Sequence, residues 1–127
     1  MTHLNYPVGD FLIRVKNAGI AGRKSASARN TKLILEVSKA LKKLGYIDGI
    51  EKEKGNITVN LTYKNKRPVL TNIKLVSKPG LRIYMSADEL ERNRKPFDYI
   101  LTTSKGVMSS KDAIKGRIGG EVIVEIL

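Results

Sequence analysis

The sequence predicts an α+β fold of two small modules, an N-terminal one of residues 1–65 and a C-terminal, β-rich one of residues 66–127. Three observations support this prediction. Apolar residues recur at helical spacing over the first 45 residues, and then alternate with polar residues from Ile57. Short strand-like segments separated by glycine and proline fill the second half. The stretch 64–68 (KNKRP), which is polar and ends in proline, is the best candidate for the boundary.

Two helices are expected in the N-terminal module. The first has apolar residues three and four positions apart, and Gly19 can end it. That apolar stripe comprises Val8, Phe11, Leu12 and Val15. The segment 20–30 (IAGRKSASARN) is small, polar and basic, so we expect an exposed loop there. Either Asn30 or Thr31 can cap the second helix.

The second helix is predicted to be amphipathic and to end at Gly45, because glycine readily adopts the left-handed backbone conformation that commonly follows the last helical residue. Its predicted apolar stripe comprises Leu33, Ile34, Val37, Leu41 and Leu44. The opposite face carries Lys32, Lys39 and Lys43. A hairpin should follow, because residues 57–63 alternate between apolar and polar side chains and residues 47–53 can pair with them across the turn Lys54-Gly55-Asn56.

The C-terminal module should be mostly β with short helices. A strand around Ile73 and Leu75 leads into Pro79-Gly80, which suits the central pair of a type II turn, and residues 81–84 are expected to continue as the partner strand. Two later segments have the pattern of a helix-capping box: Ser86-x-x-Glu89, and Ser109-x-x-Asp112, whose helix should run to about Arg117. Residues 99–102 and 121–127 read as further strands, the last one after a break at Gly119-Gly120.

Composition narrows the functions that this fold can have. The chain has 127 residues and a formal charge of +12, with +7 on residues 1–65 and +5 on residues 66–127. It has no cysteine and one histidine, His3, so thiol chemistry and a His-based triad or zinc site are nearly excluded. No apolar run reaches 18 residues and no secretory signal opens the chain. We therefore expect a cytoplasmic protein that binds a polyanion, with nucleic acid as the default partner and without a membrane, cofactor, metal or small-molecule substrate.

The segment 102–108 (TTSKGVM) is the most unusual stretch of the sequence. The hydroxyls of Thr102, Thr103 and Ser104 suit ribose and phosphate groups, Lys105 adds a charge, and Gly106 allows the backbone to approach a ligand. A hydrogen-bonded turn that caps the next helix is the alternative. A nucleotide-binding P-loop does not fit, because Gly106 follows the lysine instead of preceding it.

Other candidate residues surround this segment in the predicted sheet. Gly119, Gly120 and Glu121 can form a turn that a nucleic-acid backbone approaches, although a double glycine is also an ordinary helix-to-strand turn. Tyr84 ends a strand near the cations Arg82 and Lys78, where it can stack on a base or cover the sheet.

Two other functional classes can be weighed against RNA binding. A DNA-binding helix-turn-helix needs a turn of three or four residues, and the segment 20–30 is too long for one. A phosphoryl-transfer enzyme would need a P-loop, a carboxylate pair or a metal cluster, and the sequence offers none of these convincingly. We therefore expect a binding protein without catalytic activity.

Several segments, taken in order, resemble the family of small-subunit ribosomal protein eight, bacterial type. The segment 102–108 (TTSKGVM) is similar to the family's Ser-Thr-Ser-Lys-Gly-Val, and 77–84 (SKPGLRIY) to its Ser-Arg-Pro-Gly-Leu-Arg-Val-Tyr. Further matches are 8–18 (VGDFLIRVKNA), 44–47 (LGYI) and 119–123 (GGEVI). Tyr6 stands where the family commonly has aspartate. Order and spacing agree over essentially the whole chain, which makes the combined match specific.

The resemblance implies a structural protein that binds ribosomal RNA of the central domain of the small subunit and supports assembly of its platform. It also implies contacts with neighbouring small-subunit ribosomal proteins, and family members commonly repress translation of their own operon messenger RNA. In the family, the hydroxyl-rich loop and the Gly-Gly-Glu turn contact RNA. By this resemblance the RNA-binding residues are Thr102, Thr103, Ser104, Lys105, Gly106, Gly119, Gly120, Glu121, Tyr84, Lys78, Arg82 and Lys32.

Overall fold

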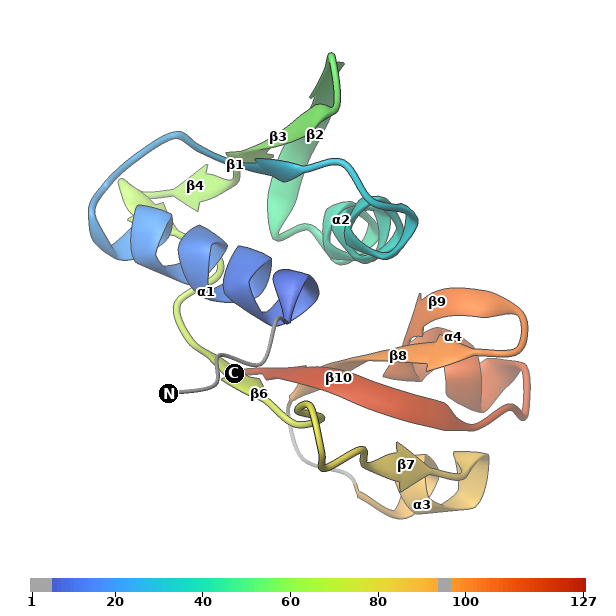
Figure 1. The fold of residues 1–127 in the computed structure, drawn as a ribbon. Coiled ribbons are helices and arrows are strands. Elements are labelled where there is room, and N and C mark those ends of the chain that lie inside the picture. The colour runs from blue at the N-terminus through green and yellow to red at the C-terminus, as the bar shows by residue number, and fades with distance from the viewer. Residues whose placement is uncertain (1–5, 94–96) are drawn as a thin grey trace.

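The N-terminal half folds as two helices packed on a three-stranded antiparallel sheet (Figure 1). The computed structural model describes residues 6–93 and 97–127, so His3 and residues 94–96 of the basic stretch 92–96 lie outside the described residues. The elements are α1 (Pro7–Ile20), β1 (Ser25–Arg29), α2 (Lys32–Leu44), β2 (Ile47–Glu53) and β3 (Asn56–Leu61). The sheet has the order β1-β3-β2.

Both predicted helices form, and local signals account for their ends. Pro7 occupies the first turn of α1, where its missing N–H costs nothing. The Thr31 side chain accepts a hydrogen bond from the Ile34 N–H at the start of α2, and Gly45 ends that helix with a φ of 90°. Leu33 departs from the predicted apolar stripe, since it is 38% exposed.

The loop predicted over residues 20–30 is wrong for its second half. Ser25–Arg29 is a strand, paired with β3 in the register Ala26 to Val59 and Ala28 to Ile57. Its residues alternate between exposed and buried, and the buried ones are alanines. Small side chains have a low strand propensity, so β1 forms because its backbone pairs with the neighbouring strand β3. Because β1 separates α1 from α2, these two helices do not form a helix-turn-helix motif.

The C-terminal half is built on a five-stranded antiparallel sheet that carries two short helices. Its elements are β6 (Ile73–Leu75), β7 (Tyr84–Met85), α3 (Ala87–Arg92), β8 (Asp98–Thr103), β9 (Gly106–Ser109), α4 (Ser110–Lys115) and β10 (Gly120–Ile126). The strand order is β6-β10-β8-β9, with β7 also paired to β10. The α+β class is therefore confirmed. Ser86 and Ser109 cap α3 and α4 as predicted, Ser86 in a complete capping box with Glu89.

One strand prediction in this half needs correction, and one strand was not predicted. Residues 81–84 do not continue as a partner of β6: beyond the bridge between Lys78 and Leu81, the chain turns away, and Tyr84–Met85 pairs with β10 instead. The Pro79-Gly80 turn itself is present, with Gly80 at a φ of 83°. Gly106–Ser109, for which the sequence predicted no strand, folds back on β8 as the strand β9.

The predicted boundary at residues 64–68 is occupied by a small hairpin of β4 (Tyr63–Lys64) and β5 (Arg67–Pro68). The two larger sheets lie on either side of it along the chain, but they share one apolar cluster. That cluster joins Phe11 and Leu12 of α1 to Ile100, Val124 and Ile126 of the C-terminal sheet. Burial of these side chains removes apolar surface of both halves from water, so each half covers the other.

Polar contacts also connect the halves. The Tyr46 hydroxyl donates a hydrogen bond of 2.6 Å to Asp98, and Lys43 pairs with Asp112 at 2.7 Å. Burial, and then the hydrogen bond to the Asp98 carboxylate, raise the pKa of Tyr46. Its phenol is therefore neutral at physiological pH and acts as a hydrogen-bond donor.

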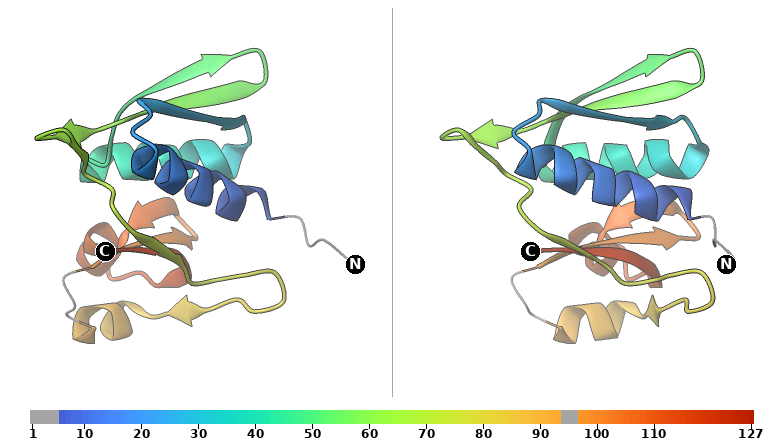
Figure 2. Two further views of the ribbon diagram at one scale, coloured as in Figure 1. Left: turned by 90° about the vertical axis from the view of Figure 1, so that its left-hand side faces the viewer. Right: turned by 60° about the vertical axis from the view of Figure 1, so that its left-hand side comes forward.

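One end of the molecule collects the N-terminal ends of both long helices and the turns of the C-terminal sheet (Figure 2). The tip of the β8–β9 hairpin, the start of β10 and the loop around Pro79 all point to this end (Figure 2). No helix in the described part of the chain is long and apolar enough to cross a membrane.

Candidate nucleic-acid interface

Three of the predicted residues form a row across neighbouring strands of the C-terminal sheet. Glu121 of β10 lies opposite Tyr84 of β7 on one side and opposite Thr102 of β8 on the other. Directly paired residues of antiparallel strands project from the same face, so the three side chains share one face. We refer to Tyr84, Glu121 and Thr102 as the polar row.

The polar row lies on the face of the sheet that α3 and α4 do not cover. The next residues along the strands, Leu101 and Val122, point the other way and are fully buried in a cluster with Leu90 and Ala113 of the short helices. Tyr84, by contrast, is 67% exposed. A tyrosine ring held open on a rigid strand offers a flat apolar surface with a hydroxyl at its edge, which suits stacking on a base or ribose.

The hairpin tip next to the row presents hydroxyls and a cation. The Thr103 hydroxyl donates to the Gly106 carbonyl at 2.7 Å and accepts from the Lys105 N–H at 3.1 Å, so it holds the turn. Gly106 takes a φ of 107°, a conformation that glycine adopts without strain. Ser104 and Lys105 are exposed. The tip is therefore partly a hydrogen-bonded turn, as the alternative interpretation of the sequence had it, although Ser109 rather than this turn caps α4.

The two adjacent glycines make room for the protein's own backbone. A Cβ on Gly119 would lie 2.5 Å from the Met85 carbonyl oxygen, and one on Gly120 would overlap the Thr102 carbonyl oxygen. Side chains at either position would push β10 away from β7 and β8. These glycines thus hold the strands of the polar row together, and close approach of RNA to them stays a prediction.

Arg82 is held in place by two neighbours. Its guanidinium pairs with the Glu121 carboxylate at 3.1 Å and lies 5.7 Å from the centre of the Tyr6 ring. The Tyr6 hydroxyl donates to the Ser77 carbonyl at 2.9 Å. Burial raises the pKa of Tyr6, although the positive charge of Arg82 opposes that shift. The ion pair with Arg82 offsets the negative charge of the Glu121 carboxylate, which lowers the repulsion between Glu121 and a phosphate.

The sequence did not single out Tyr6, although it departs from the family's usual aspartate at this position. The structure places its ring beneath Arg82, at the first residue before α1. The aromatic side chain beside a proline gave no local signal for this role, because its partners are more than 70 residues away in the chain.

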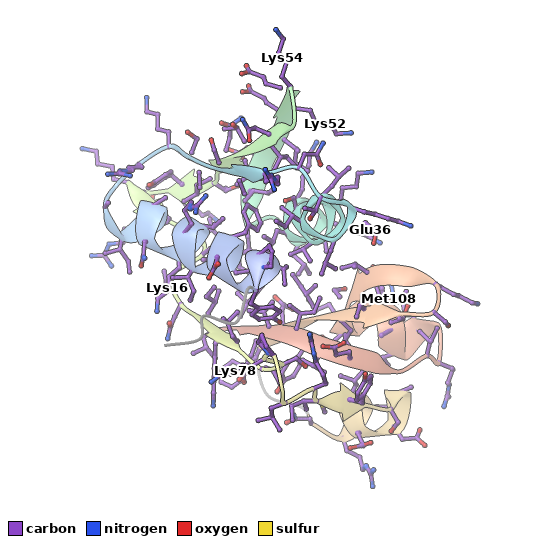
Figure 3. All side chains as sticks on the ribbon, in the orientation of Figure 1. Lys16, Glu36, Lys52, Lys54, Lys78 and Met108 are labelled. Atoms are coloured by element: carbon purple, nitrogen blue, oxygen red, sulfur yellow. The ribbon has the colours of Figure 1, made fainter. Side chains whose placement is uncertain are left out.

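The other two predicted cations lie apart from the polar row. Lys78 is exposed at the Pro79-Gly80 turn (Figure 3). Lys32 belongs to the other half, as the first residue of α2, where the positive end of the helix dipole adds to its charge. The N-terminal end of α2 points the same way as the tip of the β8–β9 hairpin (Figure 2).

The described residues contain no group of three or more side chains suited to hold a metal ion. The candidate interface offers hydrogen bonding, stacking and positive charge.

Comparison with known proteins agrees with the motifs read from the sequence. The sequence model of the Ribosomal protein S8 family matches residues 6–127. The chain belongs to this family. A protein called small ribosomal subunit protein uS8 from Nitratidesulfovibrio vulgaris (strain DP4) is 36% identical over 124 residues, covering 97% of this chain and 98% of the relative. Proteins of the same name from Malacoplasma penetrans (strain HF-2) and Cereibacter sphaeroides (strain ATCC 17025) are 38% and 37% identical, and each alignment covers at least 94% of both chains.

The predicted resemblance to the ribosomal protein S8 family is thus confirmed over nearly the whole chain. A member of this family is a protein of the small ribosomal subunit with a part in translation. The family is structural and not enzymatic.

Proposed function

We propose that the chain binds small-subunit ribosomal RNA directly, through the polar row and the tip of the β8–β9 hairpin. The observation that carries this proposal is the alignment of Tyr84, Glu121 and Thr102 at the uncovered end of one face of the sheet, beside the exposed Ser104 and Lys105. A rigid sheet keeps the spacing of these groups fixed before RNA arrives, so little ordering is needed on binding.

Each group has a distinct part in the proposed contact. The hydroxyls of Thr102 and Ser104 donate to and accept from ribose 2′-OH groups and base edges in a distorted, shallow minor groove. Lys105 and Lys78 pair with phosphates, and Tyr84 stacks on an exposed base or ribose. Recognition is then mainly of RNA shape. Thr103, Gly106, Gly119 and Gly120 contribute by holding this surface in position.

Charge on both halves adds to the affinity. The chain carries +12 overall, and Lys32 extends the positive surface from residues 66–127 to residues 1–65. We infer that the C-terminal module supplies most of the specific contacts and the N-terminal module further phosphate contacts. Such charge draws the protein to RNA and makes the affinity depend on salt.

The same surface supports two further parts of the proposal. By shaping the RNA of the central domain, the protein would assist assembly of the platform beside neighbouring ribosomal proteins. A messenger RNA that folds into a similar shape would compete for the same face, which would allow the protein to repress its own operon. Shape-based recognition makes this dual use straightforward, because it needs no shared long sequence.

Titration of the full chain with central-domain ribosomal RNA, at several salt concentrations and with duplex DNA as competitor, tests the proposal. We expect log affinity to fall linearly with log salt, with a slope that reflects several released counterions, and duplex DNA to compete poorly. Affinity that does not change between low and physiological salt would exclude the phosphate contacts. Equal competition by duplex DNA would exclude recognition of RNA shape.

A further inference from the structure

A groove lies between α2 and the edge strand β9, outside the surface proposed to bind RNA apart from Lys105 and Gly106 at its end. It has a volume of about 550 Å³. One wall is α2, with Glu36, Lys39 and Lys43. The other is formed by β9 and α4, with Met108 and Asp112. Glu36 and Met108 mark the two sides of this groove, which we call the α2–β9 groove (Figure 3).

The floor of the groove is apolar and partly open to solvent. Val107, Met108 and Ile118 are each only partly buried, and Ala40 on the facing helix is small enough to leave space above them. When an apolar side chain covers the exposed apolar surface of a concave site, that surface is removed from water and the free energy falls. A methionine suits such a floor, because its flexible side chain adapts to the shape of the occupant.

The rim of the groove carries charges of both signs. Lys39, Lys43 and Lys105 line it together with Glu36 and Asp112. Of the three lysines, only Lys43 forms an ion pair within residues 6–93 and 97–127, with Asp112 at 2.7 Å. That pair joins α2 to α4 across the groove. Lys39, which has no place in the surface proposed for RNA, is left to pair with a carboxylate from outside.

This pattern distinguishes the groove from the RNA surface. RNA presents a uniform negative charge and buries little apolar surface along its backbone, so Glu36 would repel it and the floor would stay uncovered. A peptide can satisfy both features, with an apolar side chain on Val107, Met108 and Ile118 and a carboxylate opposite Lys39.

We propose that the α2–β9 groove docks a segment of a second protein that presents an apolar anchor residue flanked by aspartate or glutamate. Because the chain is a protein of the small ribosomal subunit, the partner is a neighbour in that particle. The docking does not depend on the contacts proposed for the polar row, since Lys39, Glu36 and Met108 belong to neither the row nor the hairpin tip.

Photo-crosslinking within the assembled particle identifies the occupant. The full chain with p-benzoylphenylalanine in place of Lys39 is built into reconstituted small subunits and irradiated, and the same residue in place of Glu36 serves as a second probe. We expect a crosslink to a protein segment that contains an apolar residue next to a carboxylate. The same probe in place of Lys54, at the β2–β3 turn, should not capture that segment. Crosslinks from both groove positions to RNA alone, or to nothing, would overturn the proposal.

Binding of the captured segment, as a synthetic peptide, to the isolated full chain gives the energetic test. Lys39→Glu places like charges together and should weaken peptide binding about tenfold or more, whereas Lys54→Glu should change it less than about twofold. Both variants alter the net charge equally, so both should bind central-domain RNA with equal affinity. Peptide binding that Lys39→Glu leaves intact would contradict the docking, whereas weak RNA binding by the unsubstituted chain would contradict only the proposed function.

Discussion

One face of the C-terminal sheet has two ends with opposite character. At one end, Ile100 of β8 and Val124 of β10 face each other and are fully buried in the cluster shared with α1. Two residues further along β8, Thr102 projects from the same face, and there the row is polar and Tyr84 is open to solvent. The strands are continuous, so the cover supplied by the N-terminal half distinguishes the two ends. The buried end fixes the sheet, and the uncovered end is available to a partner.

The largest expected effect separates these two ends within one strand. Ile100→Ala removes a fully buried side chain from the shared cluster and should lower the free energy of unfolding by about 2–5 kcal/mol. RNA affinity per folded molecule should stay unchanged. Thr102→Ala is the matched variant on the same face: its stability should hardly move, while its RNA affinity should fall. Urea unfolding and RNA titration of both variants check this prediction. Loss of RNA affinity by Ile100→Ala, or loss of stability alone by Thr102→Ala, would contradict the assignment of the two ends.

A finer comparison concerns two neighbouring hydroxyls at the hairpin tip. Ser104→Ala should weaken RNA binding by about 1–2 kcal/mol, because an RNA group would be left without its partner. Its stability should change by less than about 0.5 kcal/mol, since Ser104 is exposed. Thr103→Ala removes two hydrogen bonds within the turn and should lower the melting temperature as well. If Ser104→Ala lowers stability and leaves RNA affinity intact, the tip is structural and the proposed site is misplaced.

The contact between the halves predicts a smaller effect that depends on pH. Tyr46→Phe removes the hydrogen bond to Asp98 and should cost about 1 kcal/mol of stability at pH 7. The folded state raises the pKa of Tyr46, so it holds the phenol proton more tightly than the unfolded state does. The stabilisation is therefore complete below pH 10 and is lost as the pH rises above it. The difference between the two proteins in urea unfolding should shrink from pH 9 to pH 11, and a constant difference would exclude this linkage.

The smallest expected effect concerns one phosphate contact. Lys105→Ala should reduce the slope of log affinity against log salt by about one unit and weaken binding modestly. Lys54→Ala removes the same charge from the β2–β3 turn, far along the chain from the interface, and should leave the slope as it is. Equal slopes for the two variants would show that Lys105 acts only through the overall charge of the protein.

Local chemistry explains what could be predicted from sequence. The helix caps at Thr31, Ser86 and Ser109 and the Pro79-Gly80 turn depend on residues within four positions of one another, and all are present. The alternation of residues 57–61 likewise predicted β3 and its buried side. The family motifs were also readable, because their order along the chain survives at about 36% identity.

Tertiary structure decided the features that depend on distant partners. Ser25–Arg29 becomes a strand because β3 lies beside it. The strand propensity of its small side chains is too low for the strand to be predicted from sequence. The roles of Gly119 and Gly120 follow from the approach of β7 and β8, and the packing of Tyr6 against Arg82 joins residues from opposite halves. Composition and motifs therefore determined the class of protein. The packing of one half on the other decided which part of the sheet is buried and which stays exposed, because burial depends on contacts between residues far apart in the chain.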